Sequence, residues 1–404
     1  MTRKFFLPKE VLYIISKINE AGHRADIVGG PVRDLLRGVV PSDYDITTNA
    51  RPDEIKKIFA DEKVVETGIK HGTVTLVLES GSYEITTYRV DGEYKDSRHP
   101  ESVTFTDELE LDLSRRDFTV NAIAYNDKDG VTDVFSGVED IKSGVIRAVG
   151  EPKLRFTEDA LRILRAVRFA ATLGYKIEEN TARAALECRR LLENVSVERI
   201  YTELYKLFSG EFAYRVIDEY SDIILEVLPE LSRIELPDEK LFSEASGSLR
   251  LLSLFYLANP DRCARIFKEC TMRLHTDSAT RDRGMFALGN VGKFDTDTPV
   301  GIKLLMCDMG VDVTRECVKL EVLLGIRPRT SLDILSAVIA ERPPYRPSDL
   351  DINGNDLISL GLHGASIGKA MRALLLSVAR GGVKNERKSL LKAAAEYVKE
   401  NLCE

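Results

Sequence analysis

The 404-residue chain lacks the marks of several large protein classes. No stretch approaches the roughly 20 consecutive apolar residues that span a bilayer. The N-terminal apolar run is also too short for a signal peptide. The six cysteines form no Cys-x-x-Cys pair, which argues against a zinc site and favours reduced thiols. None of the five histidines is followed by aspartate, so a His-Asp phosphohydrolase pair is absent. We therefore expect a cytoplasmic enzyme with no membrane contact.

Further absences narrow the function. A net charge of −8 argues weakly against indiscriminate nucleic-acid binding, although it allows a local basic stripe. No Gly-x-Gly-x-x-Gly follows the predicted strand over 25–28, which disfavours a dinucleotide-binding oxidoreductase. No tandem repeat or low-complexity tract is visible. With 44% hydrophobic and 30% charged residues, the composition is that of an ordinary globular protein.

A glycine pair followed by two spaced aspartates is the most informative feature that is present. Gly29 and Gly30 predict a tight turn at which a phosphate can approach the backbone. On a strand predicted over 43–47, Asp43 and Asp45 would share one face. Paired carboxylates beside a phosphate-binding turn suit a two-metal phosphoryl-transfer site. We therefore predict an Mg²⁺ site at these aspartates.

The predicted elements change character along the chain. Helical periodicity over 11–18 and a helix over 52–59 flank the strands, and alternation over 73–78 and 83–89 predicts a β-hairpin. From Glu158 onward the patterns are helical with few strand signals. Breaks in this helical remainder are predicted near 209–210, 236–238, 295–299 and 342–344.

Three downstream motifs accompany the aspartate pair. They are 114–122 (SRRDFTVNA), 158–169 (EDALRILRAVRF) and 197–200 (VERI), with Glu203 following. In this order they resemble the class II tRNA nucleotidyltransferases, which include the bacterial CCA-adding enzymes, and the related bacterial poly(A) polymerases. The tail reads LHGASIG over 362–368, which departs from the Gly-Pro-x-x-Gly expected there.

The resemblance implies an α+β fold with four parts. A nucleotidyltransferase head with a small mixed β-sheet would occupy 1–148. All-α segments would follow as a nucleotide-selecting neck (149–210), a body (211–340) and a tRNA-binding tail (341–404). No obligate protein partner is evident.

The resemblance also implies the chemistry. The 3′-hydroxyl of a tRNA would attack the α-phosphate of CTP or ATP, and pyrophosphate would leave. Asp43 and Asp45 would hold Mg²⁺, with Glu84 as a third catalytic carboxylate unless it is only a surface residue of its strand. Arg115 and Arg116 are candidates for contact with a phosphate or the ribose, and the alternative is a helix-start salt bridge to Asp117. The residues expected to bind the nucleotide in the head are Gly29, Gly30, Arg33, Arg116, Asp117 and Asn121.

Base selection is expected from Asp159 and Arg162, which match the family's Glu-Asp-x-x-Arg motif. Three residues apart on one helix, they would share a face. The carboxylate can accept a hydrogen bond from the amino group that cytosine and adenine share. The guanidinium can donate a hydrogen bond to the ring nitrogen beside that amino group. An ordinary intrahelical ion pair is the alternative. With Glu158, the further candidates Arg165 and Arg168 would orient Arg162 or stabilise the helix.

Two segments are expected to act on the tRNA substrate. Residues 91–100 resemble the flexible loop of relatives that add the final A, although the composition also suits an ordinary surface loop. Lys384, Arg387 and Lys388 form a basic cluster expected to contact the acceptor arm. Enzymes that add only A, poly(A) polymerases and a non-catalytic RNA-binding paralogue stay open as alternatives.

Overall fold

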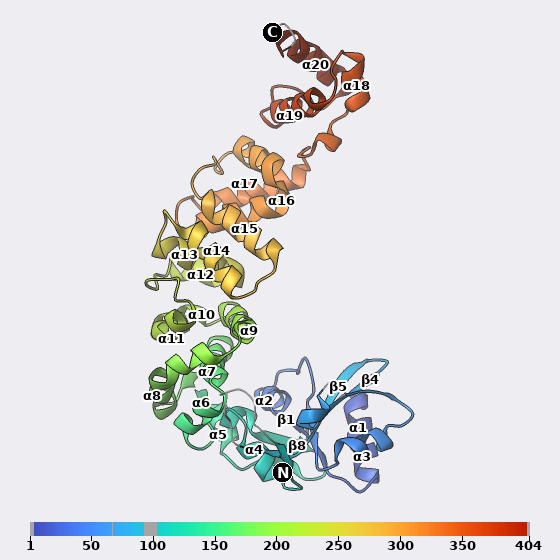
Figure 1. Cartoon of the computed structure of the whole chain (residues 1–404), viewed down its shortest axis with the longest axis vertical. Helices are drawn as coiled ribbons and strands as arrows, with labels where there is room; N and C mark the ends of the chain where they lie inside the picture. Colours follow the sequence, from blue (N-terminus) through green and yellow to red (C-terminus); the bar gives the residue numbers. More distant parts are fainter. Residues whose placement is uncertain (1–3, 67, 93–102, 402–404) are drawn as a thin grey trace. The chain divides into compact units, whose positions relative to one another are not determined.

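The computed structural model describes residues 4–66, 68–92 and 103–401. The chain forms two compact units, Met1–Leu228 and Pro229–Glu404, which are described separately (Figure 1). The first unit holds the predicted head, the predicted neck and the start of the predicted body. The four predicted domain boundaries stay predictions. Most of the predicted loop over 91–100 lies outside the described residues, so that prediction is untested.

Strands occur only in the first unit of the described chain. They are β1 (Ala25–Val28), β2 (Ile46–Thr48), β3 (Lys63–Val65), β4 (Thr73–Leu78), β5 (Gly81–Thr87), β6 (Arg89–Asp91), β7 (Val103–Phe105), β8 (Ile123–Asn126), β9 (Gly130–Asp133), β10 (Val145–Ile146) and β11 (Lys176–Ile177). Seven form one sheet in the order β3-β4-β5-β2-β1-β8-β9. Its β2–β5 pair is parallel and its other pairs are antiparallel, so the expected small mixed sheet is confirmed.

The helices of the first unit surround this sheet and continue beyond it. The α-helices are α1 (Lys9–Glu20), α2 (Gly30–Arg37), α3 (Pro52–Ile58), α4 (Leu109–Ser114), α5 (Gly137–Ser143), α6 (Pro152–Glu158), α7 (Leu161–Leu173), α8 (Glu179–Cys188), α9 (Val197–Phe208), α10 (Ala213–Glu219) and α11 (Ser221–Val227). The 3₁₀ helices are η1 (Ile69–His71), η2 (Thr119–Asn121) and η3 (Arg189–Asn194). The predicted helical face of Val11, Ile14, Ile15 and Ile18 is confirmed, because all four are buried.

Asp43 and Asp45 precede β2 instead of lying on it, which corrects the strand predicted over 43–47. All three side chains of β2 are buried. Two carboxylates placed inside so buried a strand would lose hydration without gaining partners. The loop stays attached to the sheet, because the Asp45 carbonyl accepts a hydrogen bond of 3.0 Å from Val28 N–H.

The predicted hairpin is present with shifted ends. Leu78 pairs with Gly81, so β5 begins two residues earlier than predicted and Glu79–Ser80 form the turn. The parallel pairing of β2 with β5 places Ile46 opposite Ile85. Asp45 and Glu84, which precede these two residues, therefore lie at the same level of neighbouring chain segments.

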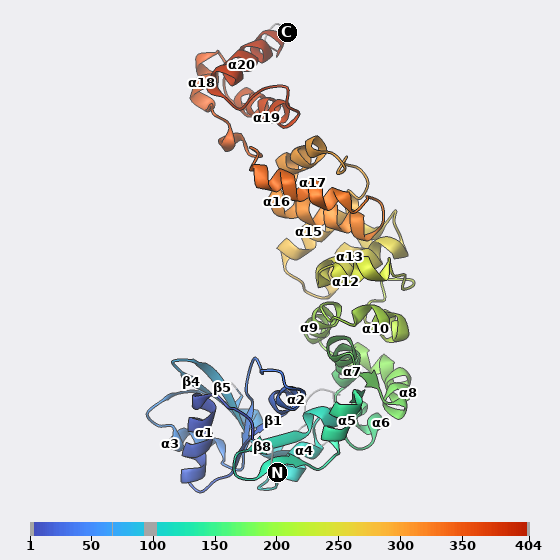
Figure 2. The same ribbon diagram turned by 180° about the vertical axis from the view of Figure 1, so that it is seen from behind.

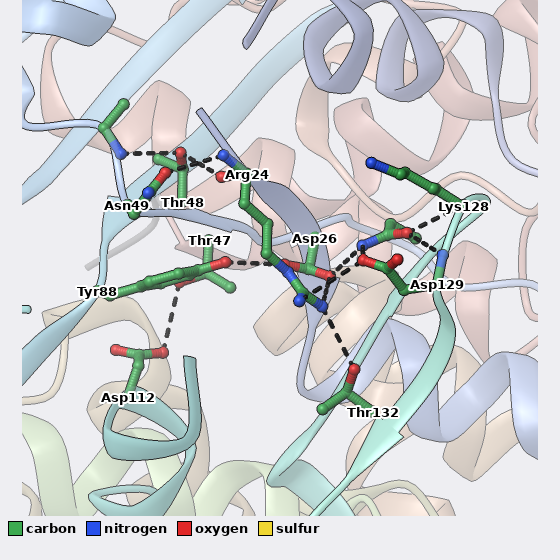
Figure 3. A network of polar contacts seen from close by, with 12 residues as sticks. Arg24, Asp26, Thr47, Thr48, Asn49, Tyr88, Asp112, Lys128, Asp129 and Thr132 are labelled. Carbon is green, nitrogen blue, oxygen red and sulfur yellow. Dashed lines mark hydrogen bonds and ion pairs between the residues drawn. The ribbon is translucent and has the colours of Figure 1, made fainter. Parts of the chain in front are cut away.

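Asp26, fully buried on β1, is the centre of a polar network inside the head (Figure 3). Its carboxylate accepts hydrogen bonds from Tyr88 Oη at 2.8 Å, Asn126 Nδ2 at 2.6 Å and Arg24 Nε at 2.8 Å. Both oxygens are partnered, and these hydrogen bonds offset part of the cost of removing the carboxyl group from water. The network joins β1 to β8 and to the end of β5.

A break separates the first two helices after the head. α6 ends at Glu158 and α7 begins at Leu161, while Asp159 has extended backbone angles of −139° and 102°. Asp159 and Arg162 therefore do not share one helix face, which corrects the geometry expected from their spacing. β11, a strand of two residues, pairs in parallel with β10.

The regular elements in the described part of the second unit are all helices (Figure 2). Its helices are α12 (Glu239–Glu244), α13 (Gly247–Ala258), α14 (Cys263–Arg273), α15 (Ser278–Gly289), α16 (Pro299–Leu323), α17 (Thr330–Glu341), η4 (Pro347–Asp349), α18 (Gly354–Ser359), α19 (Ala365–Ala379) and α20 (Arg387–Asn401). α16 is interrupted at Gly310, whose φ of 78° lies in the left-handed region. In the described part of the chain, no helix is both long and apolar enough to cross a membrane.

Candidate active site

A cavity of about 910 Å³ lies in the first unit and collects most of the predicted site residues. Seven arginines and five carboxylates line it, an excess of positive charge within a chain of net charge −8. Such a local excess attracts anionic ligands. The predicted residues in its lining are Gly29, Gly30, Arg33, Asp43, Asp45, Glu84, Arg116, Asp117, Asn121, Asp159, Arg162 and Arg165.

Asp43, Asp45 and Glu84 form the acidic side of the cavity. Partial removal from water raises the pKa of Asp45, and the nearby charges of Asp43 and Glu84 raise it further. Among the described residues, no three His, Cys, Asp or Glu side chains are close enough to form a ready-made metal site. Mg²⁺ needs only one or two protein carboxylates when phosphates and water complete its shell, so this donor set fits it.

The glycine turn lies where β1 passes into α2. Gly29 has a φ of +81°, which L side chains rarely adopt, and a Cβ there would lie 3.2 Å from Arg116 Nη1. Its N–H donates to the Ile123 carbonyl at 3.0 Å, so this group is already used within the protein. Gly29 thus permits close approach of Arg116, and α2 begins at Gly30 beside it.

A chain of hydrogen bonds crosses the cavity wall from the head to α7. Arg33 Nη1 donates to Asn121 Oδ1 at 2.8 Å, and Asn121 Nδ2 donates to Asp117 Oδ1 at 3.1 Å. Asp117 Oδ2 accepts two bonds from Arg165, at 2.9 and 2.5 Å. The alternative salt bridge from Arg115 and Arg116 to Asp117 is wrong. Both arginines pair with Asp112, which is one turn before them.

These hydrogen bonds keep the carboxyl group of Asp117 ionised. Burial alone would raise the pKa of its carboxyl, but Arg165 and the Asn121 hydrogen bond lower the pKa to about 2. Because this lies below the ordinary value, the pairing stabilises the fold above that ordinary value. Its contribution is lost as the pH falls through about 2.

We therefore predict that Asp117→Asn lowers the free energy of unfolding by about 2 kcal/mol at neutral pH. The difference in the free energy of unfolding between the variant and the unmodified protein should shrink as the pH falls below about 4. The ionised carboxyl group of Asp117 then begins to lose its stabilising contribution. Urea unfolding at a series of pH values measures both effects. A difference that is the same at every pH would contradict the assigned ionisation.

Asp159 and Arg162 do not bind each other, and each binds a different set of partners. Asp159 accepts hydrogen bonds from Arg199 on α9, at 2.8 and 3.3 Å. Arg162, which is 8% exposed, donates to Glu158 at 2.8 Å and to the Arg115 carbonyl at 2.9 Å. The alternative of an intrahelical Asp159–Arg162 ion pair is therefore wrong, although both residues line the same cavity.

Arg168, unlike Asp159, Arg162 and Arg165, does not line the cavity. Its guanidinium donates to Glu203 on α9 at 2.7 Å and lies 3.6 Å from the centre of the Phe169 ring. Arg33 and Arg165 also lie over this ring, at 5.4 and 5.3 Å. Arg168 and Phe169 thus support the arginines that do line the cavity.

Sequence reasoning assigned no role to several residues of this region. Arg199 and Glu203 were recognised as parts of a motif, and their spacing of four on a helix could have indicated a shared face. Asp112 carried no motif signal of its own. On the side of β4, the lining also includes Gly68, His71, Thr73 and Thr75.

The predicted RNA-binding residues lie in the second unit. Lys384, Arg387 and Lys388 are exposed. Arg387 is engaged within the tail, because it donates two hydrogen bonds to Asp356, at 3.1 and 2.5 Å.

Comparison with known proteins gives concordant matches. The poly A polymerase head domain family matches residues 25–147, and the family described as a probable RNA and SrmB binding site of polymerase A matches 174–234. A CCA-adding enzyme of Leuconostoc mesenteroides subsp. mesenteroides is 35% identical over 97% of this chain and 98% of its own. The chain belongs to the CCA-adding enzyme family.

Two further members of this family are informative. A Ligilactobacillus salivarius CCA-adding enzyme is 44% identical, over 63% of this chain and 64% of its own length. The crystal structure of a Bacillus stearothermophilus CCA-adding enzyme in complex with CTP has a TM-score of 0.80 and 30% identity. It covers 98% of this chain and 100% of that enzyme. The α+β fold, with a sheet-containing head followed by helices, is thus the fold of CCA-adding enzymes.

Proposed function

We propose that this protein adds C, C and A to the 3′ ends of tRNA, using CTP and ATP without a nucleic-acid template and releasing pyrophosphate. One observation carries the proposal. A single cavity contains an acidic side of Asp43, Asp45 and Glu84, an arginine-rich wall, and the junction of α6 and α7 with Asp159 and Arg162. Membership of the CCA-adding enzyme family supports the same reaction. The cytoplasm, as the compartment of tRNA processing, is the proposed location.

The carboxylates would act at the reacting phosphate. We assign Asp43 and Asp45 as ligands of Mg²⁺ and Glu84 as a third catalytic carboxylate at the same level of the sheet. Bound Mg²⁺ would supply activation of the attacking 3′-hydroxyl and neutralisation of charge on the departing pyrophosphate. Burial raises the pKa of Asp45, and the negative charges of Asp43 and Glu84 raise it further. A bound divalent cation would offset this negative charge.

The triphosphate would lie between the glycine turn and the arginines. Arg116 lies close to Gly29, while Arg33 and Asn121 are fixed to one another and to Asp117. Arg33 and Arg116 would receive the phosphates. Asp117, held by Arg165, would keep Asn121 in place. Fixed donors of this kind bind phosphate oxygens without having to reorganise.

The incoming base would be read by Asp159 and Arg162. Asp159 Oδ2 accepts one described hydrogen bond, from Arg199, so it can accept another from the amino group of cytosine or adenine. Arg162 uses Nη1 twice and Nη2 once within the described protein, which leaves Nε–H and a second Nη2–H on one edge. Uracil and guanine present the reverse pattern and would leave buried groups unpaired.

The experiment that tests the proposal uses three tRNA substrates, one lacking CCA, one ending in C and one ending in CC. Each is incubated with CTP, ATP or both, and the products are sequenced. Complete CCA on all three supports the proposal. An enzyme that adds only A would extend only the substrate ending in CC, a poly(A) polymerase would add runs of A, and a non-catalytic paralogue would add nothing.

We further propose that the tail binds the acceptor arm through Lys384 and Lys388, largely through phosphate contacts. We predict that the double substitution Lys384→Ala and Lys388→Ala weakens tRNA binding and lowers its salt dependence, because each lysine contributes to counterion release. The affinity for CTP should stay unchanged. Filter binding at several salt concentrations measures this.

A matched control replaces Lys128 and Lys142, two exposed lysines of the head, by alanine. This variant removes the same charge and should bind tRNA like the unmodified protein. Equal losses of affinity in the two variants would indicate a non-specific charge effect. Such a result would contradict a tail-specific contact.

A further inference from the structure

Asp112 on α4 is a fully buried carboxylate that joins three parts of the head. Oδ1 accepts hydrogen bonds from Arg115 Nε at 2.9 Å and Nη2 at 2.7 Å, and Oδ2 accepts from Arg116 Nη2 at 3.2 Å. A longer bond of 3.4 Å comes from the Thr47 hydroxyl on β2 (Figure 3). A second bond of 3.4 Å comes from the Arg89 N–H on β6. Both oxygens are thus occupied by donors from different elements.

Asp112 is ionised in this setting. Burial alone would raise the pKa of its carboxyl, but Arg116 and Arg115 together lower the pKa below its ordinary value. A buried charged acceptor makes strong hydrogen bonds with guanidinium groups, and two bonds to one arginine fix the plane of its side chain.

The two arginines that Asp112 holds line the cavity, and Arg116 also approaches the glycine turn. Both line the main cavity, and both line an adjoining cavity of about 170 Å³ together with Asp45 and Glu84. Arg116 Nη1 lies 3.2 Å from the position of a Cβ on Gly29. The buried Nε of Arg116 has no hydrogen-bond partner among the described residues, so the side chain has donor capacity for an anion.

We propose that Asp112 is a positioning residue, which holds Arg115 and Arg116 in the orientation that receives the triphosphate of the incoming nucleotide. It acts through the arginines and touches neither the nucleotide nor the metal. Through Thr47 it also ties them to β2, the strand that directly follows Asp45. The inference rests on the proposed function, because it assigns the triphosphate to this cavity.

Asp26 on β1 offers a matched control within the head. Like Asp112 it is fully buried and bound by an arginine, a hydroxyl and another nitrogen donor (Figure 3). Its partners Arg24, Tyr88 and Asn126 are absent from the described lining of the cavity. Asp26→Asn should therefore lower stability without changing nucleotide affinity.

The experiment measures the affinity of the full chain for ATP and CTP by calorimetry, with EDTA present to remove metal. Asp112→Asn should lower the affinity for ATP and the affinity for CTP equally, by about tenfold. This corresponds to the loss of a charge-assisted hydrogen bond. Binding of adenosine, which has no phosphate, should change less than twofold. In the addition assay, KM for both nucleotides should rise more than kcat falls.

A second background shows whether Asp112 acts through the arginines. In protein that already carries Arg115→Ala and Arg116→Ala, adding Asp112→Asn should change ATP affinity less than twofold, because nothing remains to be positioned. If Asp112→Asn does not fold, Thr47→Val removes one donor to the carboxylate and should weaken ATP by about threefold.

Unchanged ATP affinity in a folded Asp112→Asn protein would overturn the proposal, as would an equal loss in Asp26→Asn. Thr47→Val with unchanged ATP affinity would overturn it where Asp112→Asn does not fold. These outcomes are separate from the proposed function. An unmodified protein that binds ATP but adds nothing to any tRNA would contradict that function and leave the positioning role intact.

Discussion

Asp45→Asn should abolish nucleotide addition with every tRNA substrate, lowering kcat by at least about a thousandfold. The asparagine keeps the size of the side chain but removes the charge that would hold Mg²⁺ at the reacting phosphate. Asp43→Asn should have the same effect. The affinity for tRNA should stay largely intact, because neither carboxylate is assigned to tRNA binding. Single-turnover addition of A to tRNA ending in CC, together with filter binding, separates the two quantities.

The control for these variants is Glu79→Gln. Glu79 is an exposed acid in the turn of the hairpin that carries Glu84, and it does not line the cavity. This variant should add nucleotides normally. Near-normal turnover by either aspartate variant would show that the metal ligands lie elsewhere. A parallel loss in Glu79→Gln would show that the hairpin is sensitive to charge in general.

The second large effect concerns the choice of base. Asp159→Asn should lower the preference for CTP over UTP by about tenfold or more, because the amide supplies a donor where uracil presents an acceptor. Addition of A should weaken as well, since adenine uses the same carboxylate. The measurement is kcat/KM for each of the four nucleotides with a tRNA that lacks CCA.

The control for base choice is Glu203→Gln. Glu203 is buried, binds Arg168 on the same group of helices and does not line the cavity. Glu203→Gln should lower the free energy of unfolding. It should leave the ratio of kcat/KM for CTP to kcat/KM for UTP unchanged. If Asp159→Asn keeps full selectivity at a normal rate, the base is read by other groups. The opposite design, an exchange of Asp159 and Arg162, is a poor test, because an arginine at 159 would meet Arg199 and an aspartate at 162 would meet Glu158.

Local patterns predicted much of the head. The four-residue strand at 25–28, the turn at Gly29 and the buried face of α1 are set by neighbours in sequence, and all were predictable. Many residues of the predicted motifs line the cavity, whereas Arg168 does not, and lining residues such as Arg89 and His71 were not predicted.

Ion pairs between residues of different helices and strands could not be predicted from local patterns. Residues 158–169 contain no glycine or proline, so nothing local indicates the break at Asp159, which accompanies its pairing with Arg199 on α9. Arg115 and Arg116 are adjacent to Asp117 in sequence, yet Asp117 pairs with Arg165 and they pair with Asp112. Choosing among several nearby acids requires the tertiary fold.

The break between α6 and α7 has a consequence for how this enzyme could change. The groups assigned to base reading lie at the junction of α6 and α7, whereas the groups assigned to bond formation lie in the loop before β2 and on β5. A substitution of Asp159, or one that removes its hydrogen bonds with Arg199, can therefore change which nucleotide is preferred without changing the geometry of the reacting centre. Directed evolution toward unnatural nucleotides should accumulate its mutations on α6, α7 and α9.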